Sequence, residues 1–419
     1  MEKFVIRGGE PLKGVIEVAG SKNAALAILA ATLLTDEECE IDNIPLIGDV
    51  LRMIDILKSI GADVEWTGTR KLKIRAKEID PEKMDYSSVG LIRASILLLG
   101  PLLTRFKKFK IPHPGGCIIG ARPVGVHFDA LEALGAEITQ DGDFYYFQRG
   151  ELTGKKIVLK EFSVTATENL MMAASLAKGT TIIKIAAIEP HVQDLGKFLN
   201  KMGAKIKGDG VHTIVIKGQE KLHGASHVII PDPIEAGTFI IAAAASRGEV
   251  LIKNVNPDHL DLVLEKFKEF GVPLEVRRDS ILIKSPTSLK ACKIEARTYP
   301  GIPTDLQAPF AILATQANGT SLIHDTLYEG RLGYVNELNK MGANAVVCDP
   351  HRVLITGPTP LYGQEITSFD LRAGATLIIA ALIAEGESKI NEPHQVDRGY
   401  ERIEERLRGL GADIKRIRA

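Results

Sequence analysis

The stretch that decides the fold is Lys197-Phe-Leu-Asn-Lys-Met-Gly-Ala-Lys-Ile-Lys207, which is followed by Thr213-Ile-Val-Ile-Lys217. Its first half has the apolar spacing of an amphipathic helix, and the glycine after it is the residue expected at a left-handed helix cap. Two short strand-like runs come next. A helix that ends in Gly-Ala or Gly-Val recurs at intervals of 68 to 74 residues, at Gly61, Gly135, Gly203, Gly271, Gly342 and Gly411. The chain therefore reads as six copies of one unit.

Each copy also opens with a helix rich in alanine or leucine, preceded by a residue of the capping type. The expected N-caps are Ser21, Ser88, Ser163, Asp232, Thr304 and Ser368. An apolar strand such as Thr181-Ile-Ile-Lys184 separates the two helices of a copy. The unit is thus strand, helix, strand, helix, strand, strand, which predicts an α/β fold. An open helical solenoid is the alternative, but β-hairpins at this period argue against it.

The two ends of the chain suggest how the copies are grouped. The sixth copy stops at Asp413-Ile-Lys-Arg-Ile-Arg418 without its last strand, and Phe4-Val-Ile-Arg-Gly8 looks like the missing strand. We therefore expect the N-terminal strand to pair into the C-terminal half. This predicts two domains of three units each, one at 21–229 and the other made of 1–20 plus 230–419.

Composition narrows the class of protein. A chain of 419 residues with net charge −1 has ample length for two cores and no global field for nucleic acid or an acidic membrane. No CxxC pair occurs among the four cysteines, which argues against a disulfide framework or a zinc site, and the first residues contain no apolar signal-peptide core. Ala24 to Leu34 is too short to span a bilayer and reads as a buried helix. We expect a cytoplasmic protein.

One loop stands out chemically, His113-Pro-Gly-Gly-Cys-Ile-Ile-Gly-Ala-Arg-Pro123. Cys117 lies among glycines rather than inside a helix or strand, where packing cysteines are found. Arg122 is five positions further, and a nearby cation both lowers a thiol pKa and attracts anions. A surface loop with an incidental cysteine is the alternative, and the spacing alone leaves both open.

The starts of the helices are the other candidate sites. If the copies are equivalent, three helix N-termini per domain point the same way, and two domains facing each other would form a cleft lined with partial positive charge. Lys22 puts a cation where the helix dipole disfavours it, although such a side chain can simply point into water. Asp305 suits either a helix cap or a general base. Arg93 lies inside the apolar run Leu91 to Leu103 and needs an anionic partner or a cleft.

The cations as a set indicate a doubly anionic substrate, such as one with phosphate and carboxylate groups. They are Lys22, Arg93, Arg122, Arg331, Arg372 and Arg398. We expect no metal and no cofactor, because HExxH, GxGxxG and GxxxxGK[ST] are all absent from the sequence.

The chain contains six diagnostic strings, GSKNAALAILAATLL, LIRASILLLGPLL, HPGGCIIGARP, PTDLQAPF, FDLRAGATL and DRGYERIEERLRGLGA. In these strings it resembles the bacterial UDP-N-acetylglucosamine 1-carboxyvinyltransferase family, whose members are also called UDP-N-acetylglucosamine enolpyruvyl transferases. The resemblance runs end to end. It implies a two-domain inside-out α/β barrel built from six repeats. It also implies transfer of the enolpyruvyl group of phosphoenolpyruvate to the 3′-hydroxyl of UDP-N-acetylglucosamine, through a tetrahedral intermediate, as the first committed step of peptidoglycan synthesis. A monomer or weak homo-oligomer is expected.

The resemblance also implies roles for particular residues. Cys117 matches the loop acid that fosfomycin alkylates, Asp305 the base at the sugar hydroxyl and Asn23 a stabiliser of the intermediate. Lys22, Arg122 and Arg398 match the cations that bind phosphoenolpyruvate. Further substrate-binding positions implied by the resemblance are Arg93, Pro123, Val124, Ser163, Val164, Thr304, Leu327, Arg331, Asp370 and Arg372.

The sequence departs from the family at some nucleotide contacts, where Gly125 replaces the usual Asp and Thr165 the usual Gly. The rival 5-enolpyruvylshikimate-3-phosphate synthases open the first helix with Ser-Lys-Ser and lack the Pro-Gly-Gly-Cys loop. A non-catalytic UDP-sugar-binding regulator would be expected to have lost Cys117 or Asp305. A hydrolase with Cys117 as nucleophile needs a partner base, for which His127 is the nearest in sequence.

Overall fold

The computed structural model describes residues 2–116, 120 and 123–418, and these form two compact units. Residues 20–116 and 123–230 belong to the N-terminal unit, and residues 2–19 and 231–418 to the C-terminal unit. The expected domains, 21–229 and 1–20 plus 230–419, remain a prediction about which parts fold independently. No helix within the described ranges combines the length and the apolar character that crossing a bilayer requires.

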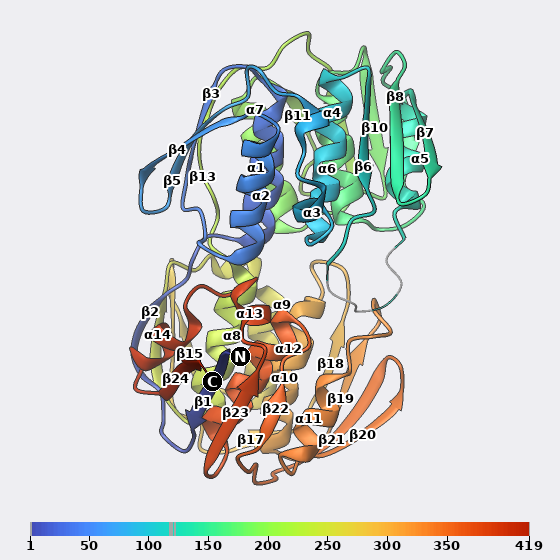
Figure 1. Ribbon diagram of the computed structural model, residues 1–419. Coiled ribbons are helices and arrows are strands. Elements are labelled where there is room, and N and C mark those ends of the chain that lie inside the picture. The colour runs from blue at the N-terminus through green and yellow to red at the C-terminus, as the bar shows by residue number, and fades with distance from the viewer. Residues whose placement is uncertain (1, 117–119, 121–122, 419) are drawn as a thin grey trace. The chain divides into compact units, whose positions relative to one another are not determined.

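The N-terminal unit alternates helices and short strands throughout (Figure 1). Its elements are α1 (Lys22–Ala31), η1 (Thr32–Leu34), β3 (Glu38–Asp42), α2 (Gly48–Ser59), β4 (Asp63–Gly68), β5 (Lys71–Arg75), η2 (Pro81–Lys83), α3 (Tyr86–Val89), η3 (Arg93–Leu98), α4 (Leu99–Arg105), β6 (Lys108–Pro112), α5 (Gly125–Leu134), β7 (Ala136–Asp141), β8 (Phe144–Arg149), β9 (Lys156–Val158), α6 (Val164–Ala174), β10 (Thr180–Lys184), α7 (Pro190–Lys201), β11 (Lys205–Lys207), β12 (Thr213–Lys217) and β13 (Ser226–Val228).

The C-terminal unit has the same alternation and includes the first two strands of the chain. Its elements are β1 (Glu2–Arg7), β2 (Lys13–Glu17), α8 (Pro233–Ala245), β14 (Glu249–Lys253), η4 (Pro257–His259), α9 (Asp261–Phe270), β15 (Leu274–Val276), β16 (Ser280–Ile283), β17 (Leu289–Lys290), β18 (Lys293–Ala296), α10 (Thr304–Gln316), β19 (Ala317–Asp325), α11 (Tyr334–Lys340), β20 (Asn344–Asp349), β21 (Arg352–Gly357), β22 (Glu365–Thr367), α12 (Leu371–Ile383), β23 (Glu387–Asn391), α13 (His394–Asp397), α14 (Ile403–Arg408) and β24 (Asp413–Arg418).

Each unit has its sheets on the outside and its apolar helices inside. In the C-terminal unit α8, α10 and α12 pack on one another, and nearly all their residues are buried. A helix that is apolar on all sides must lie inside, which is why these alanine-rich segments form the centre. The sheets around them have the orders β22-β23-β1-β24, β15-β16-β14-β2 and β17-β19-β21-β20. The N-terminal unit has the sheets β13-β3-β5-β4, β6-β8-β7 and β11-β12-β10-β9. The expected mixed α/β class is confirmed.

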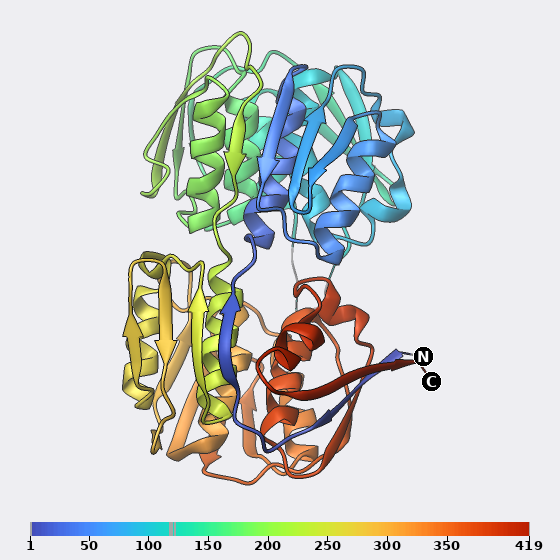
Figure 2. The ribbon, with the colours of Figure 1, turned by 90° about the vertical axis from the view of Figure 1, so that its left-hand side faces the viewer.

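The N-terminal strand joins the C-terminal half of the chain, as expected. β1 lies between β23 and β24 and pairs antiparallel with both, and β2 pairs parallel with β14. Figure 2 shows the blue N-terminal segment running along strands of the C-terminal unit. The apolar run Ala24 to Leu34 is a buried helical segment, α1 followed by η1.

The six repeated glycines all have positive φ, between 81° and 124°, as a cap after a helix requires. Three of the predicted N-caps are confirmed, since the side chains of Ser21, Ser163 and Asp232 accept from backbone N–H groups of the helices that they precede. Ser88 was a wrong assignment. It lies inside the short helix α3, and Asp85 caps that helix because its carboxylate accepts from the Ser87 and Ser88 amides.

Two further predicted caps were also wrong. Thr304 is the first residue of α10 rather than its cap, and its hydroxyl donates to Asp325. Ser368 precedes α12 by too many residues, and Asp370 caps that helix instead. At α12 the Asp370 carboxylate takes the helix amides, because a charged acceptor makes the stronger hydrogen bond. At α10 the Thr304 hydroxyl is instead used as a donor to Asp325.

Candidate active site

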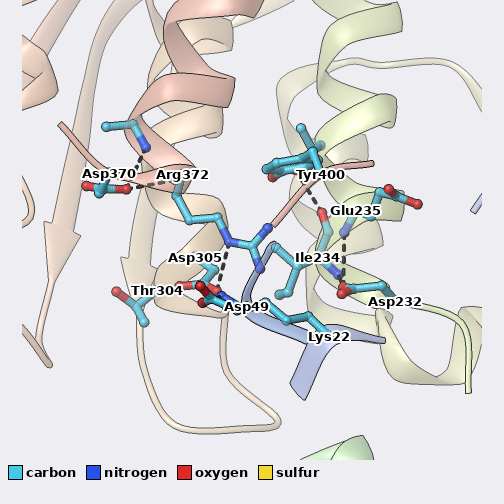
Figure 3. A network of polar contacts seen from close by, with 12 residues as sticks. Lys22, Asp49, Asp232, Ile234, Glu235, Thr304, Asp305, Asp370, Arg372 and Tyr400 are labelled. Carbon is cyan, nitrogen blue, oxygen red and sulfur yellow. Dashed lines mark hydrogen bonds and ion pairs between the residues drawn. The ribbon is translucent and has the colours of Figure 1, made fainter. Parts of the chain in front are cut away.

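Asp305 lies in the first turn of α10 and accepts hydrogen bonds from two arginines. Its Oδ1 lies 2.7 Å from Nη1 of Arg331. Its Oδ2 lies 3.0 Å from Nε of Arg372 (Figure 3). The Arg372 side chain is only 5% exposed and the Arg331 side chain 14%. Two charge-assisted bonds in so dry an environment fix the carboxylate in place and favour its ionised form.

The charges of this cluster support each other. Burial disfavours the cation of Arg331, but the Asp305 carboxylate outweighs that effect and the pKa of Arg331 lies above its ordinary value. Burial likewise opposes the charge of Arg372, whose pKa is nevertheless raised by Tyr400, Asp305 and Asp232 around it. The guanidinium groups of Arg331 and Arg372 therefore stay charged at neutral pH.

Three helices of the C-terminal unit begin at this cluster. Asp370 caps α12, and its Oδ1 accepts from the backbone N–H of Arg372 at 2.7 Å. Asp232 caps α8 and accepts from the Ile234 amide at 2.8 Å. Because α10 and α12 are joined through Asp305 and Arg372, and Asp232 at the start of α8 lies in the same cluster (Figure 3), the three helix starts lie at one end of the unit. The helix dipoles add partial positive charge there.

Thr304 and Leu327 are linked through a residue that sequence reasoning missed. Asp325, fully buried at the end of β19, accepts from the Thr304 hydroxyl and also from the backbone N–H groups of Leu327 (2.9 Å) and Tyr328 (3.1 Å). It thus ties the start of α10 to the loop that carries Leu327, which is itself 37% exposed. The only feature of the sequence that points to Asp325 as a site residue is its place at the end of an apolar strand, and that feature is a weak indication.

In the N-terminal unit Lys22 is buried at the start of α1, so it does not point into water. Its Nζ lies 2.6 Å from Oδ2 of Asp49, in the first turn of α2 (Figure 3). Both side chains are nearly inaccessible, with 11% and 6% exposed. Asn23, the next residue, is exposed. Asp49 went unnoticed because an acidic residue in a first turn usually serves only the helix dipole.

Arg93 begins η3 and contacts the two flanks of the cysteine loop. Its Nη1 lies 3.5 Å from the carbonyl oxygen of Pro114, and its Nη2 lies 3.5 Å from that of Pro123. The guanidinium of Arg93 is therefore directed at the backbone carbonyls of the loop. These contacts explain how a charged side chain can lie within the apolar run Leu91 to Leu103. Cys117 and Arg122 lie outside the described residues.

The starts of α5 and α6 are joined by a hydrogen bond. Nε2 of His127 lies 2.8 Å from Oγ1 of Thr165, one of the residues that depart from the family pattern. Burial, followed by the charge of Arg93, lowers the pKa of His127 to about 3, so the imidazole is neutral at physiological pH. Ser163 caps α6, Val164 is the first residue of that helix, and Val124 is buried just before α5.

Comparison with known proteins decides the relationship. The family model EPSP synthase (3-phosphoshikimate 1-carboxyvinyltransferase) matches residues 6–407. The chain belongs to this family. Among curated members, the UDP-N-acetylglucosamine 1-carboxyvinyltransferase of Koribacter versatilis (strain Ellin345) is 46% identical, with 100% of this chain and 97% of the relative covered. UDP-N-acetylglucosamine 1-carboxyvinyltransferase 1 of Caldanaerobacter subterraneus subsp. tengcongensis is also 46% identical, with 99% of each chain covered.

Two solved structures have a similar fold. The enolpyruvyl transferase NikO from Streptomyces tendae matches with a TM-score of 0.91 and 26% identity, over 100% of this chain and 99% of that one. EPSP synthase from Acinetobacter baumannii matches with a TM-score of 0.75 and 19% identity over the whole of both chains, which shows a common fold and no more.

Arg398 lies in one of the strings that resemble the family, and Gly125 lies just after another. Arg398 follows α13, and its Nη1 lies 3.3 Å from Oε1 of Gln395. Asp397 next to it binds Arg416 of β24. Gly125, where the family usually has Asp, has open space around it, since a Cβ there would meet no atom within 4 Å. The glycine is thus not required by crowding within the described residues.

Proposed function

We propose that this chain transfers the enolpyruvyl group of phosphoenolpyruvate to the 3′-hydroxyl of UDP-N-acetylglucosamine with release of phosphate, the first committed step of peptidoglycan synthesis. The observation that carries the proposal is the full-length similarity to UDP-N-acetylglucosamine 1-carboxyvinyltransferases at 46% identity. The reaction proceeds by addition of the hydroxyl to phosphoenolpyruvate and elimination of phosphate from a tetrahedral intermediate.

Asp305 is the proposed base at the sugar hydroxyl. The contacts of its carboxylate with Arg331 and Arg372 support this role, because they keep the group ionised and aim it in one direction. Positioning a base within hydrogen-bond reach of its proton matters more than basicity alone. Cys117 is the proposed acid that protonates the methylene carbon.

Binding of phosphoenolpyruvate is assigned to Lys22, Arg122 and Arg398, and stabilisation of the intermediate to Asn23. The buried pairing of Lys22 with Asp49 supports a fixed cation, since a tethered ammonium loses little further freedom when an anion binds. The nucleotide is assigned to Ser163 and Val164. Further substrate-binding positions in the proposed cleft are Arg93, Pro123, Val124, Thr304, Leu327, Arg331, Asp370 and Arg372. We place the reaction in the cytoplasm, because both proposed substrates are multiply charged and do not cross a bilayer unaided.

Phosphate release from phosphoenolpyruvate tests the proposal directly. The acceptors to compare are UDP-N-acetylglucosamine and shikimate 3-phosphate, each before and after treatment with fosfomycin. Release with the UDP-sugar alone, blocked by fosfomycin, is the expected result. Release with shikimate 3-phosphate, or with neither acceptor, would refute the proposed substrate.

A matched pair of variants tests the base. Asp305→Asn keeps the shape of the side chain and removes its charge, so turnover should fall by about 10² or more, as is typical for loss of a general base. Asp349→Asn removes a carboxylate from the β20–β21 hairpin, where it binds Arg352, and should leave turnover unchanged. Full activity of Asp305→Asn would rule out the role.

A further inference from the structure

Tyr400 lies against the buried arginine of the Asp305 cluster. It follows α13 in the chain, its side chain is fully buried, and Cζ of Arg372 lies 5.1 Å from the centre of its ring (Figure 3). Arg372 uses Nε for Asp305, while its Nη1 is buried without a hydrogen-bond partner among the described residues. The electron-rich face of the aromatic ring adds to the stabilisation that the carboxylates of Asp305 and Asp232 give this cation.

The direction of the hydrogen bonds shows how the ring is held. Thr238 on α8 donates its only hydroxyl proton to the carbonyl oxygen of Ile234, at 2.8 Å. The Tyr400 hydroxyl lies 2.8 Å from the same Thr238 oxygen. Since the Thr238 proton is already used, the tyrosine must be the donor of that bond. The ring is therefore fixed at its hydroxyl end by α8 and presents its face to Arg372 of α12.

We propose that Tyr400 is a positioning residue for the transfer reaction, which holds the Arg372 guanidinium in the orientation that aligns Asp305. The chain of contacts runs from Ile234 through Thr238 and Tyr400 to Arg372, and from there to the carboxylate. The inference rests on the proposed function only for the role of Asp305 as the base. The contacts themselves join α8, α10 and α12 within one unit.

A tyrosine that only fills the core would behave differently. Loss of its hydroxyl would then lower the stability of the unit without changing the local motion of Arg372 or the catalytic rate constant. The variants needed to separate the two roles are Tyr400→Phe, which keeps the ring and frees it from α8, and Tyr400→Leu, which removes the ring. Thr238→Val removes the anchor from the other side, and Thr238→Ser restores it.

The first measurement is the solvent exchange of the Arg372 Nε–H group by NMR, with its signal assigned by its loss in Arg372→Lys. In the native protein this proton is bonded to Asp305 and should exchange slowly. We expect exchange about tenfold faster in Tyr400→Phe and in Thr238→Val, faster still in Tyr400→Leu, and near native in Thr238→Ser. Native exchange in Tyr400→Leu would overturn the proposal, and this readout does not depend on which substrate the enzyme uses.

The second measurement is the kinetics of phosphate release. Tyr400→Phe and Thr238→Val should each lower kcat about tenfold, while both KM values stay within about twofold of the native values. The double variant should have the same kcat as either single variant, because both changes break one chain of contacts. Thr315→Val, which deletes a buried hydroxyl at the far end of α10, is the control and should leave kcat unchanged. Faster exchange with an unchanged kcat would overturn the positioning role. If the native protein releases no phosphate with either acceptor, the proposed function fails and the exchange data alone decide whether Tyr400 orients Arg372.

Discussion

Glu168 offers the sharpest prediction about stability. It lies on α6 with 1% of its surface exposed, and its Oε1 has no hydrogen-bond partner among the described residues. Burial, reinforced by the nearby charge of Glu189, raises the pKa of Glu168 well above the ordinary value of 4.5. The folded protein therefore keeps the proton on Glu168 over a range of pH in which the unfolded chain has lost it.

The sign and size of the effect follow from this difference. Well below pH 4.5 both states are protonated and Glu168 does not oppose folding through ionisation. As the pH rises, only the unfolded state releases its proton, so the free energy of unfolding falls by about 1.4 kcal/mol per pH unit until the folded pKa is reached. Glu168→Gln has nearly the same shape and no proton to release. Relative to the native protein it should gain stability between pH 5 and pH 7, by up to about 3 kcal/mol.

The chain provides its own probe for the assay. Trp66, the only tryptophan, lies on β4 of the same unit, so its fluorescence during urea unfolding reports on the part of the protein that contains Glu168. The difference in unfolding free energy between variant and native protein should be measured at pH 5, 6 and 7, which cancels the titration of all other groups. Glu161→Gln, an exposed glutamate in the same unit, is the control. Parallel curves for Glu168→Gln and the native protein would refute the reasoning.

Three further predictions concern buried or partly buried polar contacts. Asp49→Ala should cost about 3–5 kcal/mol in urea unfolding followed by tryptophan fluorescence, because it removes the carboxylate that pairs with the buried Lys22 ammonium. A loss below about 1 kcal/mol would mean that water reaches the lysine. Thr165→Val should cost about 1–3 kcal/mol in the same assay, since it removes the hydrogen-bond partner of Nε2 of the buried His127, and an unchanged midpoint would contradict this. Arg416→Met should destabilise the C-terminal unit by about 1–3 kcal/mol, because three carboxylates lose a shared cation; circular dichroism during thermal unfolding measures it, and a native melting temperature would contradict it.

Local features of the chain were predictable because their signals are local. The positive φ of the cap at Gly203 follows from the missing Cβ, and the strand Thr213–Lys217 follows from its alternating β-branched residues. Pairing of the N-terminal strand was also predictable, since an unpaired edge in the last copy needs a partner. The wrong caps at Ser88 and Ser368 show the limit, as both lie beside an aspartate that competes for the same amides.

Site contacts were much harder to predict than elements. Sequence reasoning selected Asp305, Arg331 and Arg372 individually, but nothing in the order of residues indicates that the two arginines share one carboxylate. Tyr400 and Thr238 attracted no attention at all, because a buried tyrosine or threonine has the same appearance in a sequence whether it fills space or orients a neighbour.

The sequence by itself determined the period of the chain, its α/β class, the buried helices and the family to which it belongs, because these depend on residue type and spacing over a few turns of chain. Only the tertiary structure decided which polar groups meet. Asp305 and Arg372 are 67 residues apart and Thr238 and Tyr400 are 162 apart. Hydrogen bonds and ion pairs act over about 3 Å, so their partners are set by how the helices pack, and many different pairings are compatible with the same pattern of apolar residues.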